Sequence, residues 1–117
     1  MKHLIKLLIL FSVSLYAGKV DVEAVKYNCN QDMICAFSVT LKHNDTGWKH
    51  YADKYDIVAN GKIIATRVLL HPHVDEQPFT RSISNVKIPK DVKSVLVRGH
   101  DLVHGYGGKE LRVSLKP

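Results

Sequence analysis

The fold class is decided by residues 55–70, which read YDIVANGKIIATRVLL. Two apolar runs, Tyr55–Ala59 and Lys62–Leu70, flank the dipeptide Asn60-Gly61. Asn-Gly is the dipeptide most typical of a two-residue hairpin turn, because both positions of that turn require a positive φ. The pattern therefore predicts two antiparallel strands joined by a tight turn.

Alternation of polar and apolar residues predicts further strands on both sides of this hairpin, and no window shows sustained helical periodicity. Seven short strands, with a turn every 8–12 residues or so, predict an all-β fold: a seven-stranded antiparallel sandwich of immunoglobulin or fibronectin-III type. A small closed β-barrel is the alternative. The five additional strands are expected at Lys19–Tyr27 with a slip at Ala24-Val25, Ile34–Leu41, Phe79–Ile88, Lys93–Arg98 and Leu111–Leu115.

Residues 1–17 have the pattern of a secretory signal peptide. Lys2 and Lys6 give a basic start, an apolar run follows, and the small Ala17 predicts cleavage before Gly18. A retained membrane helix is the alternative, but the apolar run is shorter than the roughly 20 residues that a span needs. We expect a periplasmic or secreted protein in which residues 18–117 form one domain, without stable membrane insertion. The residue directly after the cleavage point is Gly18 and not cysteine, so a lipid anchor is not expected.

The charge of the chain gives no sign of nucleic-acid binding. The formal net charge of +6 falls to +4 once Lys2 and Lys6 are removed with the leader, and the remaining basic residues are scattered among acidic ones. Nucleic-acid-binding proteins more often carry a basic stripe with interleaved aromatic residues. We therefore expect ordinary solvated surface charge and no nucleic-acid partner.

The two cysteines, Cys29 and Cys35, flank a polar segment typical of a turn. In an oxidising compartment such a close pair favours a disulfide that closes a hairpin over a metal site. The chain has no CxxC spacing, which argues against thiol redox chemistry.

The histidines after the leader fall in three segments that are predicted to be loops. These loops, 43–53, 71–78 and 100–109, alternate with three plain turns. If the strands alternate in direction, the three loops lie together at one end of the molecule, and scaffold loops often carry binding residues. The six histidines concerned are His43, His50, His71, His73, His100 and His104.

Two histidine pairs have spacings that suit a metal ion. His71 and His73 flank a proline and would point to one side of an extended backbone, as two ligands of one ion require. An HxxxH pair follows in the last loop, where Asp101 could orient an imidazole. Imidazoles without thiolate or methionine favour Zn(II) or Cu(II). The expected ligands are His71, His73, His100 and His104, with Glu76 and His50 as optional additions.

A metal-free interaction domain is the second functional class, because sandwich domains commonly bind peptides, glycans or envelope proteins. Trp48 is expected either to cover the end of the core or to form the wall of a pocket, and the first is favoured. An enzyme with histidine and carboxylate as acid and base is the third and least favoured class, since no nucleophile motif is present. The residues expected to contact a partner are Trp48, Tyr51, Arg81 and Tyr106.

Three segments resemble the signature of a family of small, exported, largely uncharacterised bacterial proteins: residues 47–53 (GWKHYAD), 71–82 (HPHVDEQPFTRS) and 104–108 (HGYGG). The resemblance would cover nearly all of the chain after the leader. It implies an envelope location and that the three loops belong together. It implies no particular activity, cofactor or catalytic residue.

Overall fold

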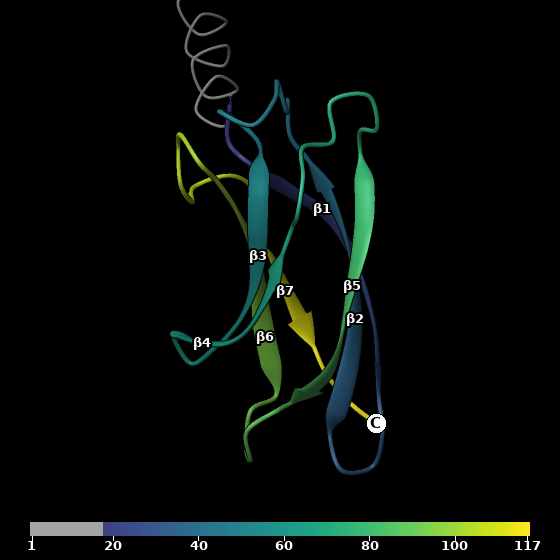
Figure 1. Ribbon diagram of the computed structural model, residues 1–117. Coiled ribbons are helices and arrows are strands. Elements are labelled where there is room, and N and C mark those ends of the chain that lie inside the picture. Colours follow the sequence, from purple (N-terminus) through teal and green to yellow (C-terminus); the bar gives the residue numbers. More distant parts are fainter. Residues whose placement is uncertain (1–17) are drawn as a thin grey trace, which may run out of the picture.

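Seven strands form two antiparallel sheets that face each other, as Figure 1 shows. One sheet has the order β1-β2-β5 and the other the order β4-β3-β6-β7, and neither closes into a barrel. This computed structural model describes residues 18–117, so the predicted leader lies outside the described residues. The predicted β-sandwich is confirmed. The strands are β1 (Asp21–Cys29), β2 (Ile34–Lys42), β3 (Ala52–Ala59), β4 (Lys62–Val68), β5 (Phe79–Lys87), β6 (Ser94–Asp101) and β7 (Leu111–Ser114).

The hairpin predicted from Asn60-Gly61 is formed by β3 and β4. Ala59 pairs with Lys62, and the two residues between them, Asn60 and Gly61, have φ values of 52° and 78°. Positive φ at both positions is what a two-residue hairpin turn of the favoured twist requires. The predicted slip in the first strand is also present, as a bulge that begins at Val22, slightly earlier than expected.

The core lies between the two sheets and is built largely from alternate residues of β2, β3 and β6, including Phe37, Tyr55 and Val97. Val20, just before β1, is also part of it and is 1% exposed. A Cβ added to Gly99 of β6 would lie 2.3 Å from the Val20 side chain, and one added to Gly108 would lie 1.8 Å from the Val20 carbonyl oxygen. The start of the domain is therefore tightly packed against β6 and the β6-β7 loop.

The predicted disulfide between Cys29 and Cys35 is confirmed. The two residues are directly paired in the β1-β2 ladder, with a Cα–Cα distance of 4.1 Å. It joins the ends of the two strands beside the turn at residues 30–33, so its role is structural.

The three histidine-bearing loops lie together at one end of the sandwich, at the top of Figure 1, and the three plain turns lie at the other. One boundary was predicted wrongly: His100 and Asp101 belong to β6 rather than to the following loop. The reason is that β3 begins at Ala52, earlier than expected, and its first residues pair with these two. The described chain has no helix long and apolar enough to cross a membrane.

Candidate metal centre

The alternation of β2 continues beyond its last paired residue and carries two polar side chains into the core. Leu41 points inward, and the same two-residue period places His43 and Asp45 on the same face. Their exposed fractions are 3% and 2%. The same alternation is visible in the sequence beyond Leu41 and indicates that both side chains point inward. Both residues had been predicted to lie in a loop, and neither was among the predicted site residues.

Asp101 reaches the same region from the other sheet by the same period. Val95, Val97, Gly99 and Asp101 of β6 are buried, while His100 points to the outer face. One oxygen of Asp101, Oδ1, accepts the backbone N–H groups of the two residues that follow Leu102, at 2.8 and 2.6 Å. Oδ1 therefore stabilises the start of the β6-β7 loop, whereas Oδ2 makes no hydrogen bond to this loop.

His50 closes the arrangement from the β2-β3 loop, which is a tight turn with a bridge between Gly47 and His50. Its ring packs edge-on against the rings of His43 and His104, at centroid distances of 4.8 and 5.1 Å. The His50 side chain is 22% exposed, whereas those of His43 and Asp101 are fully buried. Solvent therefore reaches the group from the side of His50.

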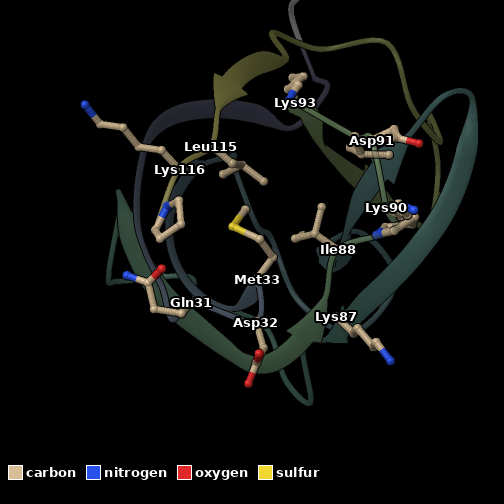
Figure 2. A pocket seen from close by; sticks show the side chains of 13 residues that line it. Gln31, Asp32, Met33, Lys87, Ile88, Lys90, Asp91, Lys93, Leu115 and Lys116 are labelled. Carbon is tan, nitrogen blue, oxygen red and sulfur yellow. The ribbon is translucent and has the colours of Figure 1, made fainter.

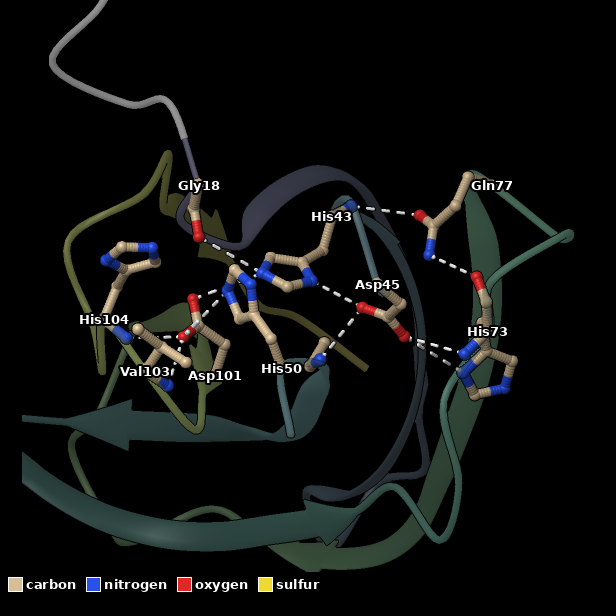
Figure 3. A network of polar contacts seen from close by, with 10 residues as sticks. Gly18, His43, Asp45, His50, His73, Gln77, Asp101, Val103 and His104 are labelled. Atoms are coloured by element: carbon tan, nitrogen blue, oxygen red, sulfur yellow. Dashed lines mark hydrogen bonds and ion pairs between the residues drawn. The ribbon is translucent and has the colours of Figure 1, made fainter. Parts of the chain in front are cut away.

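His43, His50 and Asp101 form a group whose ligand atoms all lie within 4.8 Å of one another. Asp101 Oδ2 is 3.3 Å from His43 Nε2, and Asp101 Oδ1 is 3.6 Å from His50 Nε2. Ligands of a tetrahedral ion with bonds of 2.0–2.1 Å are separated by about 3.3–3.4 Å. The two distances to Asp101 are close to this separation, and the group as a whole, drawn in Figure 3, is compact enough that it could hold one ion.

Two of these atoms are buried and unsatisfied. His50 Nε2 and Asp101 Oδ2 have no hydrogen-bond partner among residues 18–117. The approach of His43 Nε2 to Asp101 Oδ2 is close but does not have hydrogen-bond geometry. Buried polar atoms are nearly always paired, so two unpaired atoms that face one small space require an explanation. A cation between them would satisfy both.

Asp45 holds His43 in the orientation that such a cation needs. Nδ1 of His43 donates to Asp45 Oδ1, so Nε2 faces Asp101. Asp45 also accepts the backbone N–H groups of Ala52 at 3.0 Å and of His73 at 2.7 Å. Metal-binding histidines usually donate their second ring nitrogen to a carboxylate in this way.

The charges of the centre allow a metal-free alternative. The side chains of Asp45 and Asp101 are both fully buried, and buried carboxylates need compensating positive charge. A protonated His43 between them would supply one positive charge, whereas a divalent ion would supply two. The two states differ by a proton, because an ion at His43 Nε2 displaces the hydrogen from that nitrogen.

The predicted pair His71 and His73 lies beside β5. The His73 ring stacks on Phe79 at 3.9 Å, and its Nε2 accepts from Arg81 Nη2 at 2.8 Å. Burial, and after it the positive charge of Arg81, lowers the pKa of His73 and so favours the neutral ring. His71 is exposed, with its ring 4.6 Å from that of His73.

His100 lies on the outer face of the larger sheet. Its Nδ1 pairs with Asp53 Oδ1 at 2.6 Å, and its ring packs edge-on against Tyr106 at 4.8 Å. The Tyr106 hydroxyl in turn donates to the buried Asp56 carboxylate at 2.5 Å, and Arg98 stacks over the Tyr106 ring at 4.0 Å. Tyr106 therefore covers a buried carboxylate.

The remaining predicted residues lie on the surface around the centre. Trp48 is 66% exposed and packs edge-on against Tyr51 at 5.7 Å, so the interpretation of Trp48 as a cover for the core is wrong. The short β2-β3 turn carries the side chain outward, away from the core. Arg81 also donates to the exposed Glu76, at 3.2 Å.

The structure does not gather the four expected ligands in one group. His104 lies against His50, His71 and His73 lie beside β5, and His100 lies on the outer face. Within residues 18–117, the three-residue group that could hold an ion is His43, His50 and Asp101. Of these, His50 was an optional ligand, Asp101 was expected only to orient a histidine, and His43 was not expected to take part.

A hollow of about 550 Å³ lies at the opposite end of the sandwich (Figure 2). Met33 and Leu115 are among its apolar lining residues, and Lys87, Lys90 and Lys93 are among the lysines at its rim. No histidine lines it. It is chemically unrelated to the centre described above.

The chain is 45% identical over 78 residues to a protein of Halomicrobium mukohataei named "Putative lipoprotein". The matched region makes up 66% of this chain and 38% of that protein, so the chain spans less than two-fifths of the length of this relative. The name describes that protein and states no ligand or activity. No family model and no solved structure matches the chain.

Proposed function

We propose that this chain is an exported metal-binding module that holds one Zn(II) or Cu(II) ion between His43, His50 and Asp101. The observation that carries the proposal is the pair of buried, unpaired atoms, His50 Nε2 and Asp101 Oδ2, within 4.8 Å of a third ligand atom. Export is supported by the leader pattern of residues 1–17 and by the similarity to a protein named as a lipoprotein.

The ligand set favours these two ions. Two imidazoles and one carboxylate suit Zn(II) and Cu(II), whereas thiolate and thioether ligands suit Cu(I). Three ligands from the protein leave at least one position of the ion open. The His50 side chain is partly exposed although its Nε2 is buried, so a movement of this ring would let an ion enter and leave. This arrangement suits a protein that buffers or delivers a metal outside the cytoplasm.

Metal affinity of the untagged chain 18–117 tests the proposal. We expect a dissociation constant for Zn(II) or Cu(II) below about 10 μM in a competition assay. His50→Ala removes a ligand whose Nε2 has no hydrogen-bond partner in the described part of the chain, so the fold should tolerate it. Asp101→Asn keeps the oxygen that holds the β6-β7 loop and replaces the unpaired one with an amide. Each variant should weaken binding by about 100-fold.

His71→Ala is the matched control, because this exposed histidine lies outside the group. It should bind metal like the original chain. Equal affinity of the original chain, His50→Ala and Asp101→Asn would overturn the proposal.

A second function is favoured by the exposed apolar side chains around the centre. Trp48 is 66% exposed, Leu102 49% and Val103 59%, all at the histidine end. Exposed apolar groups gathered in one place often mark a protein contact. We propose an envelope protein or peptide with an apolar face as the partner. A photoreactive residue at position 48 should give cross-links in cells that the same residue at Lys62 does not, and equal yields would contradict this function.

A further inference from the structure

Gly18 lies directly at the proposed metal centre. Its carbonyl oxygen accepts a hydrogen bond from His43 Nε2 at 3.2 Å, and Figure 3 draws this contact. An ion bound at His43 Nε2 would take the place of that hydrogen and would therefore lie next to the carbonyl oxygen. The first described residue is therefore as close to the ligand His43 as Asp101 is.

The backbone conformation of Gly18 favours glycine, and the His104 side chain leaves little room for a larger residue. Its φ of +82° lies in the left-handed region, which other residues rarely adopt. A Cβ at this position would lie 2.7 Å from His104 Nε2. The absence of a side chain lets the backbone approach two imidazoles, those of His43 and His104.

The backbone is held in place shortly after Gly18. Val20 is wedged between Gly99 and Gly108, where any side chain would collide with it. At the start of β1, the backbone N–H of Val22 donates to the Lys109 carbonyl oxygen at 2.8 Å. Since Gly18 precedes these contacts by only a few residues, its approach to the centre is fixed by the packing of the domain.

We propose that Gly18, once cleavage after Ala17 has made it the first residue, binds the ion through its α-amino nitrogen and its carbonyl oxygen. This inference rests on the proposed function above. Hydrolysis of the Ala17–Gly18 bond by a signal peptidase consumes one water, leaving a carboxylate on Ala17 and an amine on Gly18. Removal of the leader would therefore complete the metal centre.

Cleavage changes the ability of the Gly18 nitrogen to bind a metal ion. In the uncleaved chain it is an amide whose lone pair is delocalised into the preceding carbonyl, so it is a poor ligand. As an α-amine it loses its proton near pH 8 and becomes a good one. The amine and the carbonyl oxygen of one residue close a five-membered ring with a metal. Together with His43, His50 and Asp101 they give three nitrogens and two oxygens, a set that favours Cu(II).

Two chains that differ only at the start test this inference. One begins at Gly18, and the other carries the native residues Tyr16 and Ala17 before it, so that the nitrogen of Gly18 is again an amide. We expect the extension to weaken Cu(II) binding by about tenfold or more, because it removes a ligand that is already tethered at the site. His50→Ala in each chain shows whether the amine acts together with the side-chain ligands.

Electron paramagnetic resonance of the Cu(II) form gives an independent readout. With ¹⁵N-labelled glycine, the chain that begins at Gly18 should show coupling of copper to an amine ¹⁵N, and the extended chain should not. Equal affinity of the two chains, with binding still lost in His50→Ala, would overturn this inference and leave the metal site in place. Binding that His50→Ala does not change would overturn the proposed function itself.

Discussion

The two ends of the sandwich use the same strands for opposite purposes. At the end of the plain turns, the disulfide and residues with positive φ such as Asn60 and Asp91 make the connections short. At the histidine end, two buried carboxylates, Asp45 and Asp101, hold long loops by accepting their backbone N–H groups. One end is therefore stabilised by local backbone geometry and the other by buried negative charge. Buried negative charge must be compensated by positive charge, so the histidine end is suited to bind a cation.

The sharpest test of this contrast is Asp45→Ala against Asp32→Ala. Loss of the Asp45 carboxylate leaves the Ala52 N–H, the His73 N–H and His43 Nδ1 without their acceptor inside the protein. We expect the free energy of unfolding to fall by about 4 kcal/mol, measured by urea denaturation.

Asp32→Ala is the control, because the exposed Asp32 lies in the β1-β2 turn and its side chain has no hydrogen bond in the structure. It should change the free energy of unfolding by less than about 0.5 kcal/mol. Similar losses in the two variants would show that the histidine end is no more dependent on buried charge than the other.

Metal should stabilise the chain through the histidine end. At a free Zn(II) concentration 100 times the dissociation constant, we expect the free energy of unfolding to rise by about 2.7 kcal/mol. The gain should vanish in His50→Ala and persist in His71→Ala, as measured by urea denaturation with and without the ion. An equal gain in His50→Ala would mean that the ion binds elsewhere.

Removal of the disulfide should act on stability alone. Replacing Cys29 and Cys35 by serine frees the β1-β2 turn in the unfolded chain and should cost about 2 kcal/mol in the free energy of unfolding. Metal affinity should be unchanged, because the disulfide and the metal centre lie at opposite ends. Altered affinity in the folded double variant would show that the two ends are coupled.

Loss of the Tyr106 hydroxyl, which bonds the buried Asp56, should reduce stability by less than loss of the disulfide. Tyr106→Phe removes one hydrogen bond to the carboxylate and leaves those from Thr66 and Arg98. We expect a loss of about 1.5 kcal/mol in the free energy of unfolding. Tyr51→Phe, which removes the hydroxyl of another tyrosine at the histidine end of the sandwich, is the control. It should lower the free energy of unfolding by less than Tyr106→Phe.

The weakest expected effect is a pH dependence from His73. Burial, then the charges of Arg81 and His71, lower its pKa below 6.5, against the opposing effect of Asp45 and Glu76. The unfolded chain then binds a proton more readily, so the stability that His73 provides is present above pH 6.5 or so and is lost as the pH falls below it. His73→Phe, which can still stack on Phe79, should reduce the loss of stability between pH 7.5 and 5.5. An unchanged loss would assign the acid sensitivity to other groups.

Sequence patterns were sufficient to predict the sandwich, the disulfide and the end of the molecule at which the histidines lie. All three follow from local rules: turn residues, two-residue alternation and alternating strand direction. Which residues form the candidate metal centre could not be predicted, because the answer depends on where the strands end. Because β2 was ended at Leu41 and β6 at Arg98, His43 and Asp45 were not seen to point inward, and Asp101 was placed in a loop. The stacking of His73 on Phe79 depends on packing between loops, which no local pattern encodes.

The neighbouring residues His100 and Asp101 lie on opposite faces of β6, which has a consequence for insertions and deletions. Loss of a single residue between Val97 and His100 would turn the imidazole into the core and the carboxylate to solvent, although no ligand had been replaced. Relatives that bind an ion in the same way should therefore keep the length of this segment. They should also keep Gly99, because a side chain at this position would collide with Val20.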